Sequence, residues 1–309
     1  MRIFFSIVFL LYAAFCLAEL TVNSAKSSES KYKFNPDHIA FNDDSDFEKR
    51  PEPKPGEWLY RFNEKGQTFE QYVAENPNRL SSECFRIYLQ PIGQFNPQQQ
   101  DILNKVQEFA GIFFQTDVVI TFTIPLPITG YRERKETHKE WTQYHTLTIL
   151  DKVLKPNLPK NAFCYLGITM SDLYPEESWN FVFGQASLKE RVGVYSLARY
   201  FPSFYGEKET PRNQLQILRR SCKVLSHETG HMYGINHCIF YRCDMSGSNS
   251  LEEMDSRPIH LCPVCLKKLA WNSGFDIIER EQKLLKFHEN NKLKEEYDWT
   301  TKRLKKITK

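Results

Sequence analysis

The stretch HETGHMYGINHCIFYRCDM, from His227 to Met245, places three histidines, one glutamate and two cysteines within nineteen residues. The whole chain contains only eight histidines in 309 residues. On an α-helix, residues four apart lie on one face, so His227 and His231 direct two imidazoles toward one point. Glu228 faces the same cleft without being needed as a ligand. This H-E-x-x-H spacing is typical of zinc hydrolases.

The continuation of the motif supplies a third histidine. Gly234 follows His231 by three residues, and a glycine there can adopt a left-handed conformation and end the helix. The chain can then turn back and bring His237 to the same metal. Three neutral imidazoles leave the fourth tetrahedral position to water, as a catalytic zinc site requires. We therefore predict that His227, His231 and His237 bind a catalytic zinc and that Glu228 accepts a proton from the water.

A histidine-bearing helix buried in a core is the alternative, but three histidines and a glutamate on one face would make a poor core. The full H-E-x-x-H-x-x-G-x-x-H string marks metzincin metallopeptidases, in which a methionine turn lies beneath the metal. Met245 follows His237 by eight residues, and Gly247 is available for a tight turn. We expect Met245 to form an apolar floor and not to bind the metal.

Four cysteines lie in two close pairs near this motif: Cys238 and Cys243, and Cys262 and Cys265. Paired spacings of this kind are typical of a structural zinc held by four thiolates. Two disulfides are the alternative, although a bond within CPVC would close a very small loop. We therefore predict two zinc ions per chain, one catalytic and one structural. Because His237 and Cys238 are adjacent, the structural site can hold the loop that carries Met245.

The beginning of the chain resembles a secretory signal peptide. Arg2 precedes an apolar run that ends in small residues at Ala18, and the run is shorter than the roughly twenty residues that span a bilayer. We expect cleavage after residue 18 and a secreted chain without stable membrane association, or a cytosolic one if the leader is not used. N-terminal sequencing would check this. An uncleaved anchor or a buried helix is the alternative.

The organisation of the remaining chain follows from its composition. Residues 19–57 are polar and proline-rich and are expected to be poorly ordered, residues 58–297 to form one domain, and residues 298–309 to be a frayed basic tail. Strands are expected within 84–93, 117–126, 161–170, 180–187 and 192–200. Helices are expected within 96–114, 213–233 and 276–297, with irregular structure over 235–266. This alternation predicts an α/β fold (α+β) with a mixed, largely parallel five-stranded sheet.

The motifs together resemble the archaemetzincin family, and most its eukaryotic branch. The resemblance rests on residues 227–245, on RPIHLCPVCLKKL (257–269), and upstream on GITMSDLYPEESWNFVFGQASL (167–188) and SLARY (196–200). It implies a metzincin-like catalytic domain, whose sheet-and-helix subdomain faces a smaller irregular lower subdomain with a structural zinc. It also implies the ligands and the base named above, and a peptidase that acts on small peptides.

The resemblance further implies an antiparallel edge strand, Phe181 to Ala186, that borders the cleft and pairs with the substrate backbone. The expected substrate-binding residues are Phe181, Val182, Phe183 and Gly184. We expect a monomer that acts on a peptide or small protein and has no nucleic-acid partner, since the net charge is only +3. The alternatives are a catalytically silent zinc protein that binds peptides in its cleft, and a zinc store or sensor; the intact Glu228 disfavours both. No role is assigned to Cys84, Cys164 and Cys222.

Overall fold

The structure, a computed structural model, describes residues 32–136 and 139–308. The predicted signal peptide, residues 1–18, lies outside the described residues, as do residues 19–31. Among the helices that the structure does describe, none combines the length and the apolar character needed to cross a membrane.

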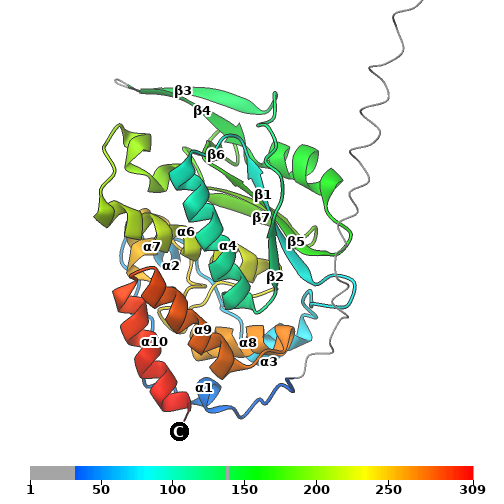
Figure 1. Cartoon of the computed structure of the whole chain (residues 1–309), viewed down its shortest axis with the longest axis vertical. Coiled ribbons are helices and arrows are strands. Elements are labelled where there is room, and N and C mark those ends of the chain that lie inside the picture. Colours follow the sequence, from blue (N-terminus) through cyan, green and yellow to red (C-terminus); the bar gives the residue numbers. More distant parts are fainter. Residues whose placement is uncertain (1–31, 137–138, 309) are drawn as a thin grey trace, which may run out of the picture. The chain divides into compact units, whose positions relative to one another are not determined.

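A five-stranded mixed sheet runs through the centre of the fold in the order β2-β1-β5-β8-β7 (Figure 1). Four strands are parallel, and β7 runs antiparallel to β8 at one edge. The predicted mixed, largely parallel sheet is therefore confirmed. Its strands are β1 (Arg86–Ile92), β2 (Asp117–Ile120), β5 (Ala162–Thr169), β7 (Gly184–Ser187) and β8 (Val192–Ser196).

Strand β5 is buried along its whole length because both faces of the sheet are covered. Successive side chains of a strand point to opposite faces. Cys164, Leu166 and Ile168 accordingly join the large core beneath the long helices, whereas Tyr165 joins a smaller core on the other face. The smaller core is closed by the helical turns α5 (Thr146–Thr148), η1 (Ile149–Leu154) and η2 (Lys155–Asn157).

Two long helices, α4 (Pro97–Phe114) and α6 (Pro211–Met232), pack against each other, and both contribute apolar side chains to the large core. Helix α4 begins with a capping box, in which Asn96 and Gln99 satisfy each other's backbone N–H groups. Helix α6 begins with Thr210 as its N-cap and a proline at its first position. Both helices begin and end within two residues of the predicted bounds, and α6 carries the first two histidines.

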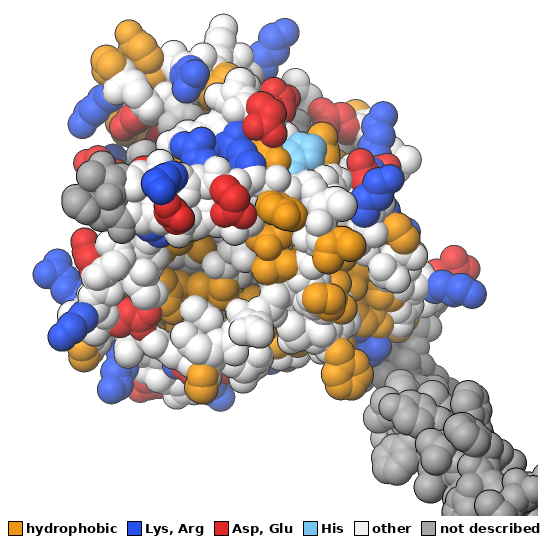
Figure 2. Space-filling view, turned by 90° about the horizontal axis from the view of Figure 1, so that it is seen from above, with side chains coloured by type: hydrophobic (Ala, Val, Ile, Leu, Met, Phe, Trp, Pro, Cys, Tyr) orange, Lys and Arg blue, Asp and Glu red, His pale blue; other side chains and the backbone are white. Residues whose placement is uncertain are grey.

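A second, three-stranded sheet was not predicted. It has the order β3-β4-β6 and contains β3 (Tyr131–Glu136), β4 (Lys139–His145) and β6 (Asp172–Tyr174). The sequence YRERKE of β3 has no apolar alternation, so pairing with β4 and not burial stabilises this strand. Figure 2 shows this side of the molecule from above, where charged side chains of both signs are interspersed with apolar ones.

The remaining elements are short, or follow α6 in the chain. The segment after α6 is mostly irregular, as predicted, but it contains two helices around the paired cysteines. Before α6 in the chain, the remaining elements are α1 (Ile39–Asn42), α2 (Trp58–Arg61), α3 (Phe69–Ala74), η3 (Ala198–Tyr200) and η4 (Pro202–Tyr205). The two helices after α6 are α7 (Leu251–Ser256) and α8 (Pro263–Ser273).

The end of the chain differs from the prediction. Instead of one helix over 276–297 and a frayed tail, two helices, α9 (Ile277–Asn290) and α10 (Lys294–Ile307), lie side by side (Figure 1). They are separated by a turn in which Lys292 has a φ of 58°. Residues at helical spacing, including Thr300, Arg303 and Ile307, are buried. The helix was missed because two of these buried positions are polar.

The prediction of a poorly ordered segment over 19–57 is wrong for residues 32–57, which belong to the same compact unit as the rest of the described chain. Ala40, Phe41 and Phe47 join the large core. The buried carboxylate of Asp46 forms ion pairs with Arg303 and two lysines of α10. A polar composition did not prevent ordering here, because a few apolar residues and one buried ion-pair network fasten the segment to the C-terminal helices.

Candidate active site

The three histidines of the motif meet at the C-terminal end of α6. His227 and His231 lie one helical turn apart, with ring centres 4.6 Å from each other. Gly234 has a φ of 79°, which confirms the predicted left-handed residue at the end of the helix. The chain then turns back, and the ring centre of His237 lies 5.2 Å from that of His227 and 4.9 Å from that of His231.

Each imidazole is held through its Nδ1 atom by an oxygen. The carbonyl of Asp244 lies 3.0 Å from His227, the carbonyl of Ile235 lies 2.8 Å from His231, and a carboxylate oxygen of Glu64 lies 2.8 Å from His237. Because these oxygens only accept, we assign the ring protons of His231 and His237 to Nδ1, which leaves their Nε2 atoms with lone pairs that can bind a metal. At His227, a guanidinium nitrogen of Arg257 also lies 3.0 Å from Nδ1, so a backbone carbonyl and an arginine hold this atom together.

The free nitrogens have a spacing suited to zinc. One ligand atom from each histidine can be chosen so that all lie within 4.8 Å of one another. The Nε2 atoms of His227 and His231 are 3.1 Å apart. Two nitrogens of a tetrahedral site with zinc–nitrogen bonds of 2.0–2.1 Å lie about 3.3 Å apart. The observed spacing is close to this value, so the residues fit the metal.

The electrostatic environment keeps the two helical histidines neutral. Burial, and then the positive charge of Arg257, hold the pKa of His227 well below its ordinary value. Burial lowers the pKa of His231 to about 3. Burial also raises the pKa of Glu228 to about 7. At neutral pH both imidazoles are therefore in the form that binds a metal, and the glutamate is poised to exchange a proton.

Glu228 lines a cavity of about 520 Å³ together with His231 and His237. The wall opposite the helix includes Ala186, from the edge strand β7, and Leu188 just beyond it. The cavity thus joins the histidine cluster, the glutamate and one edge of the sheet, as a site for an extended substrate would require.

The edge strand starts later than expected. Strand β7 covers Gly184–Ser187 and not Phe181–Ala186, and none of the four expected substrate-binding residues lines the cavity. Phe181 lies under the guanidinium of Arg199, Val182 donates its N–H to the carbonyl of Leu173, and Phe183 packs on Tyr200. Phe181 and Phe183 therefore pack on η3, and the backbone of Val182 pairs with β6. The residues of this segment that line the cavity, Ala186 and Leu188, follow them in the chain.

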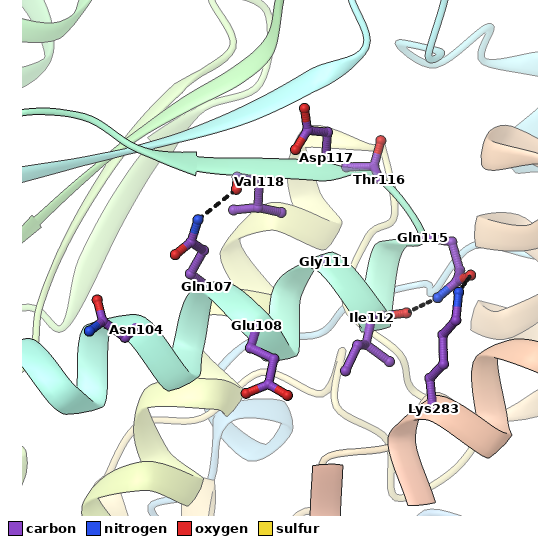
Figure 3. A pocket seen from close by; sticks show the side chains of 10 residues that line it. All are labelled: Asn104, Gln107, Glu108, Gly111, Ile112, Gln115, Thr116, Asp117, Val118 and Lys283. Atoms are coloured by element: carbon purple, nitrogen blue, oxygen red, sulfur yellow. Dashed lines mark hydrogen bonds between the residues drawn. The ribbon is translucent and has the colours of Figure 1, made fainter. Parts of the chain in front are cut away.

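A larger cavity, of about 590 Å³, lies between α4 and β2 (Figure 3). Its lining includes Gln107, whose side-chain amide donates to the carbonyl of Val118, and Lys283 from α9. No histidine or cysteine is among its lining residues. Volume alone would favour this cavity, but the convergent nitrogen ligands belong to the smaller one.

Met245 lies against α6 next to the histidines and is fully buried. Its carbonyl accepts a hydrogen bond from the N–H of Cys238 at 2.8 Å, which holds the turn that contains Met245 against the backbone just after His237. Gly247 does not serve the expected tight turn. Its φ is not in the left-handed region, and a Cβ there would lie 2.5 Å from the ring of Trp58, so this glycine makes room for the tryptophan.

The contact between Met245 and α6 requires a glycine at position 230, between the two helical histidines. A Cβ on Gly230 would lie 2.4 Å from the Met245 sulfur. We expect Gly230→Ala to displace Met245 and lower the free energy of unfolding by about 1–3 kcal/mol through overpacking. Activity should fall as well, because the neighbouring ligand shifts. Chemical denaturation and steady-state kinetics would measure both effects.

Gly111→Ala in α4 is the matched control, because its Cβ would meet only ordinary contacts, the nearest at 3.6 Å. This change should stabilise the protein by about 0.5–1 kcal/mol through helix propensity. If Gly230→Ala also stabilises the protein, the proposed steric role of Met245 is wrong.

The four paired cysteines converge in the buried interior. Their sulfur atoms all lie within 4.8 Å of one another, and those of Cys238 and Cys262 are 3.6 Å apart. Four sulfurs around a zinc ion, with bonds of about 2.3 Å, are about 3.8 Å apart. All seven described cysteines are free in the structure. The cluster is consistent with a structural zinc, and none of its cysteines forms a disulfide in the structure.

The three unassigned cysteines lie outside this cluster. Cys164 is in the centre of the sheet and Cys222 is within α6, and burial raises the pKa of both thiols. Cys84 is half-buried, with its sulfur 3.2 Å from a guanidinium nitrogen of Arg191.

Sequence reasoning missed Glu64 and Trp58 as parts of the site. The indole N–H of Trp58 donates to the same oxygen of Glu64 that faces His237, and its ring packs edge-on against that histidine. Burial raises the pKa of Glu64, but hydrogen bonds from His237 and Trp58 outweigh it, and the net shift is downward. The local sequence FNEKGQ carries no metal-binding motif, so no signal in the sequence pointed to this glutamate.

The chain is similar to known proteins over much of its length. The model of peptidase family M54 matches residues 98–271. Human archaemetzincin-2 is 38% identical over 262 residues, which cover 75% of this chain and 72% of the relative. Human archaemetzincin-1 is 33% identical over 255 residues, covering 74% and 51% respectively. Among solved structures, an archaemetzincin from Methanopyrus kandleri aligns with a TM-score of 0.49 and 28% identity, covering 62% of this chain and 96% of that one.

Proposed function

Because this chain belongs to the archaemetzincin family of zinc metallopeptidases, we propose that it hydrolyses peptide bonds at the three-histidine site, with Glu228 as the general base. The observation that carries the proposal is the convergence of one nitrogen from each of three histidines beside the half-buried Glu228, which lines an accessible cavity. The family membership supports the reaction class, and the geometry supports these residues as its agents.

His227, His231 and His237 would hold the catalytic zinc. When bound, zinc polarises a carbonyl oxygen and makes a water molecule more acidic. The protein's part is to present three imidazole nitrogens in fixed orientations. The polar contacts at each Nδ1 restrain rotation of the rings, so that little reorganisation is needed when the metal binds.

Glu228 would move the proton. Its carboxylate can accept a proton from the attacking water and then donate it to the nitrogen of the leaving amine. Burial places this group in a region of low dielectric and raises its pKa toward neutrality. A cation held by the adjacent imidazoles would lower that pKa again and favour the carboxylate that accepts the proton.

The substrate would be an extended peptide or a small protein segment lying along β7. This strand is at the edge of the five-stranded sheet, with β8 on one side only. An edge strand offers backbone N–H and C=O groups to an added strand. Since Ala186 lines the cavity, a peptide paired with β7 would pass in front of Glu228.

A second zinc at Cys238, Cys243, Cys262 and Cys265 would be structural. Four thiolates complete a tetrahedral shell and leave no position for water. The cluster joins the loop after His237 to the beginning of α8, because Cys262 is the N-cap of that helix. This arrangement supports a role in holding the loop that carries both His237 and Met245.

Incubation of the zinc-loaded protein with a mixed peptide library, with cleavage sites read by mass spectrometry, tests the proposed function. We expect cleavage that disappears after mild chelation and returns when zinc is added. Peptides that bind without being cleaved by the zinc-loaded protein would overturn the proposal in favour of the silent peptide-binding alternative.

A further inference from the structure

We propose that Glu64 is a positioning residue for the third histidine, and that the chain before the family-matched region thereby completes the metal site. The inference rests on the proposed catalytic zinc at the three histidines. Residues 46–67, called the N-terminal strap below, carry this glutamate, and they precede the residues 98–271 that the family model matches.

The first observation is an asymmetry among the three histidines. His227 and His231 are oriented by backbone carbonyls that lie within seventeen residues of them, and His227 is also contacted at Nδ1 by a guanidinium nitrogen of Arg257 at 3.0 Å. His237 is oriented by a side-chain carboxylate 173 residues away. A carboxylate accepts a stronger hydrogen bond than a neutral carbonyl, and it makes the opposite ring nitrogen a better electron-pair donor. The third ligand therefore depends on the strap in a way that the other two do not.

The second observation is that Glu64 is itself held in place. Its Oε1 atom receives the indole N–H of Trp58 at 2.9 Å as well as the imidazole of His237. The backbone N–H of Trp58 in turn donates to Glu253 at 3.0 Å. The absence of a side chain at Gly247 lets the indole lie in this position. A carboxylate fixed by two donors can set the direction of the imidazole and does not simply follow it.

The third observation is that the strap contacts the chain on both sides of His237. After the histidine, Lys49 forms a β-bridge with Tyr241 between the first two paired cysteines. Before it, Gln67 donates to the carbonyl of Gly234 and accepts from the N–H of Asn236, both at 3.2 Å. The backbone on each side of His237 is thus fastened to the strap that supplies Glu64. The strap acts as a second support for this ligand, in addition to the cysteine cluster.

A metal-affinity experiment tests the proposal without relying on activity alone. The histidine site of the full protein is emptied by mild chelation and titrated with Co²⁺, whose absorption without thiolate-to-metal charge transfer distinguishes imidazole ligands from the cysteine cluster. We expect Glu64→Ala to weaken Co²⁺ affinity at the histidine site by about 10–100-fold. Glu64→Gln should recover part of this loss, because its amide oxygen can still accept from His237.

Glu48→Gln is the control, because Glu48 lies on the same strap and pairs with Arg242 at 2.8 Å but touches no histidine. Its Co²⁺ affinity should equal that of the parent. If the Glu64→Ala and Glu64→Gln variants are both folded and both bind Co²⁺ with an affinity within twofold of the parent's, Glu64 does not position His237 and the inference is wrong. If the parent itself binds no Co²⁺ at the histidines, the proposed catalytic site fails instead, so the two failures are distinguishable.

Discussion

Replacement of Glu228 by alanine should abolish peptide hydrolysis while the zinc stays bound. The carboxylate lines the same cavity as His231 and His237, but it is not one of the converging ligands. Without it, no group in this position accepts the proton of the attacking water. General acid–base groups contribute about 10²–10⁴-fold to rate, so we expect kcat to fall by at least this range.

Glu228→Gln is the more conservative variant, because it preserves the shape of the side chain and removes only the base. It should lose activity as alanine does. His231→Ala should behave differently and lose the catalytic metal together with activity, as metal analysis would show. A Glu228 variant that hydrolyses peptide at the parent rate would contradict the assignment of this residue as the base.

Replacement of Cys262 by serine should remove the structural zinc and destabilise the whole lower part of the fold. Cys262 is fully buried and its backbone N–H donates to the sulfur of Cys243 at 3.2 Å. Metal binding to thiolate sites in isolated zinc-finger peptides contributes on the order of 10 kcal/mol to folding. Loss of even a third of that would lower the melting temperature of a domain of this size by about 10 °C.

The measurement pairs metal content with thermal unfolding. The parent should contain two zinc ions per chain, of which the one at the histidines is removed first by a mild chelator. Cys262→Ser should retain at most one zinc and unfold at a lower temperature. Cys84→Ser is the control, since Cys84 lies outside the cluster and is half-buried, and it should keep both ions. One zinc in the parent, with the four cysteines linked as disulfides in peptide mapping, would contradict the structural site.

The cysteine experiment also probes the connection between the two sites. Cys238 directly follows His237, and the backbone N–H of Cys238 donates a hydrogen bond to the carbonyl of Met245. If the cluster supports the catalytic site, Cys262→Ser should weaken Co²⁺ binding at the histidines in addition to its effect on stability. Loss of stability with unchanged Co²⁺ affinity would mean that the strap carrying Glu64 supports His237 without help from the cysteines.

Much of the metal chemistry was predictable because it is encoded over short distances in the chain. The spacing of His227 and His231 is a property of any α-helix, and Gly234 ends that helix wherever the rest of the chain lies. The apolar runs of β5 and β8 predict strands buried on both faces, whatever covers them. Such local rules involve only neighbouring residues, so they can be read from the sequence.

The parts that escaped prediction depend on contacts between residues far apart in the chain. The charged strand β3 exists because β4 pairs with it, and the strap is ordered because Asp46 meets Arg303 at the other end of the chain. Glu64 becomes part of the site only because folding brings it to His237, 173 residues later. A buried polar group needs a partner of opposite character, and nothing in a single sequence says which distant residue provides it. Helix geometry and chain reversal thus specify the three histidines locally, whereas the choice of the carboxylate that orients His237 is made only by the tertiary structure.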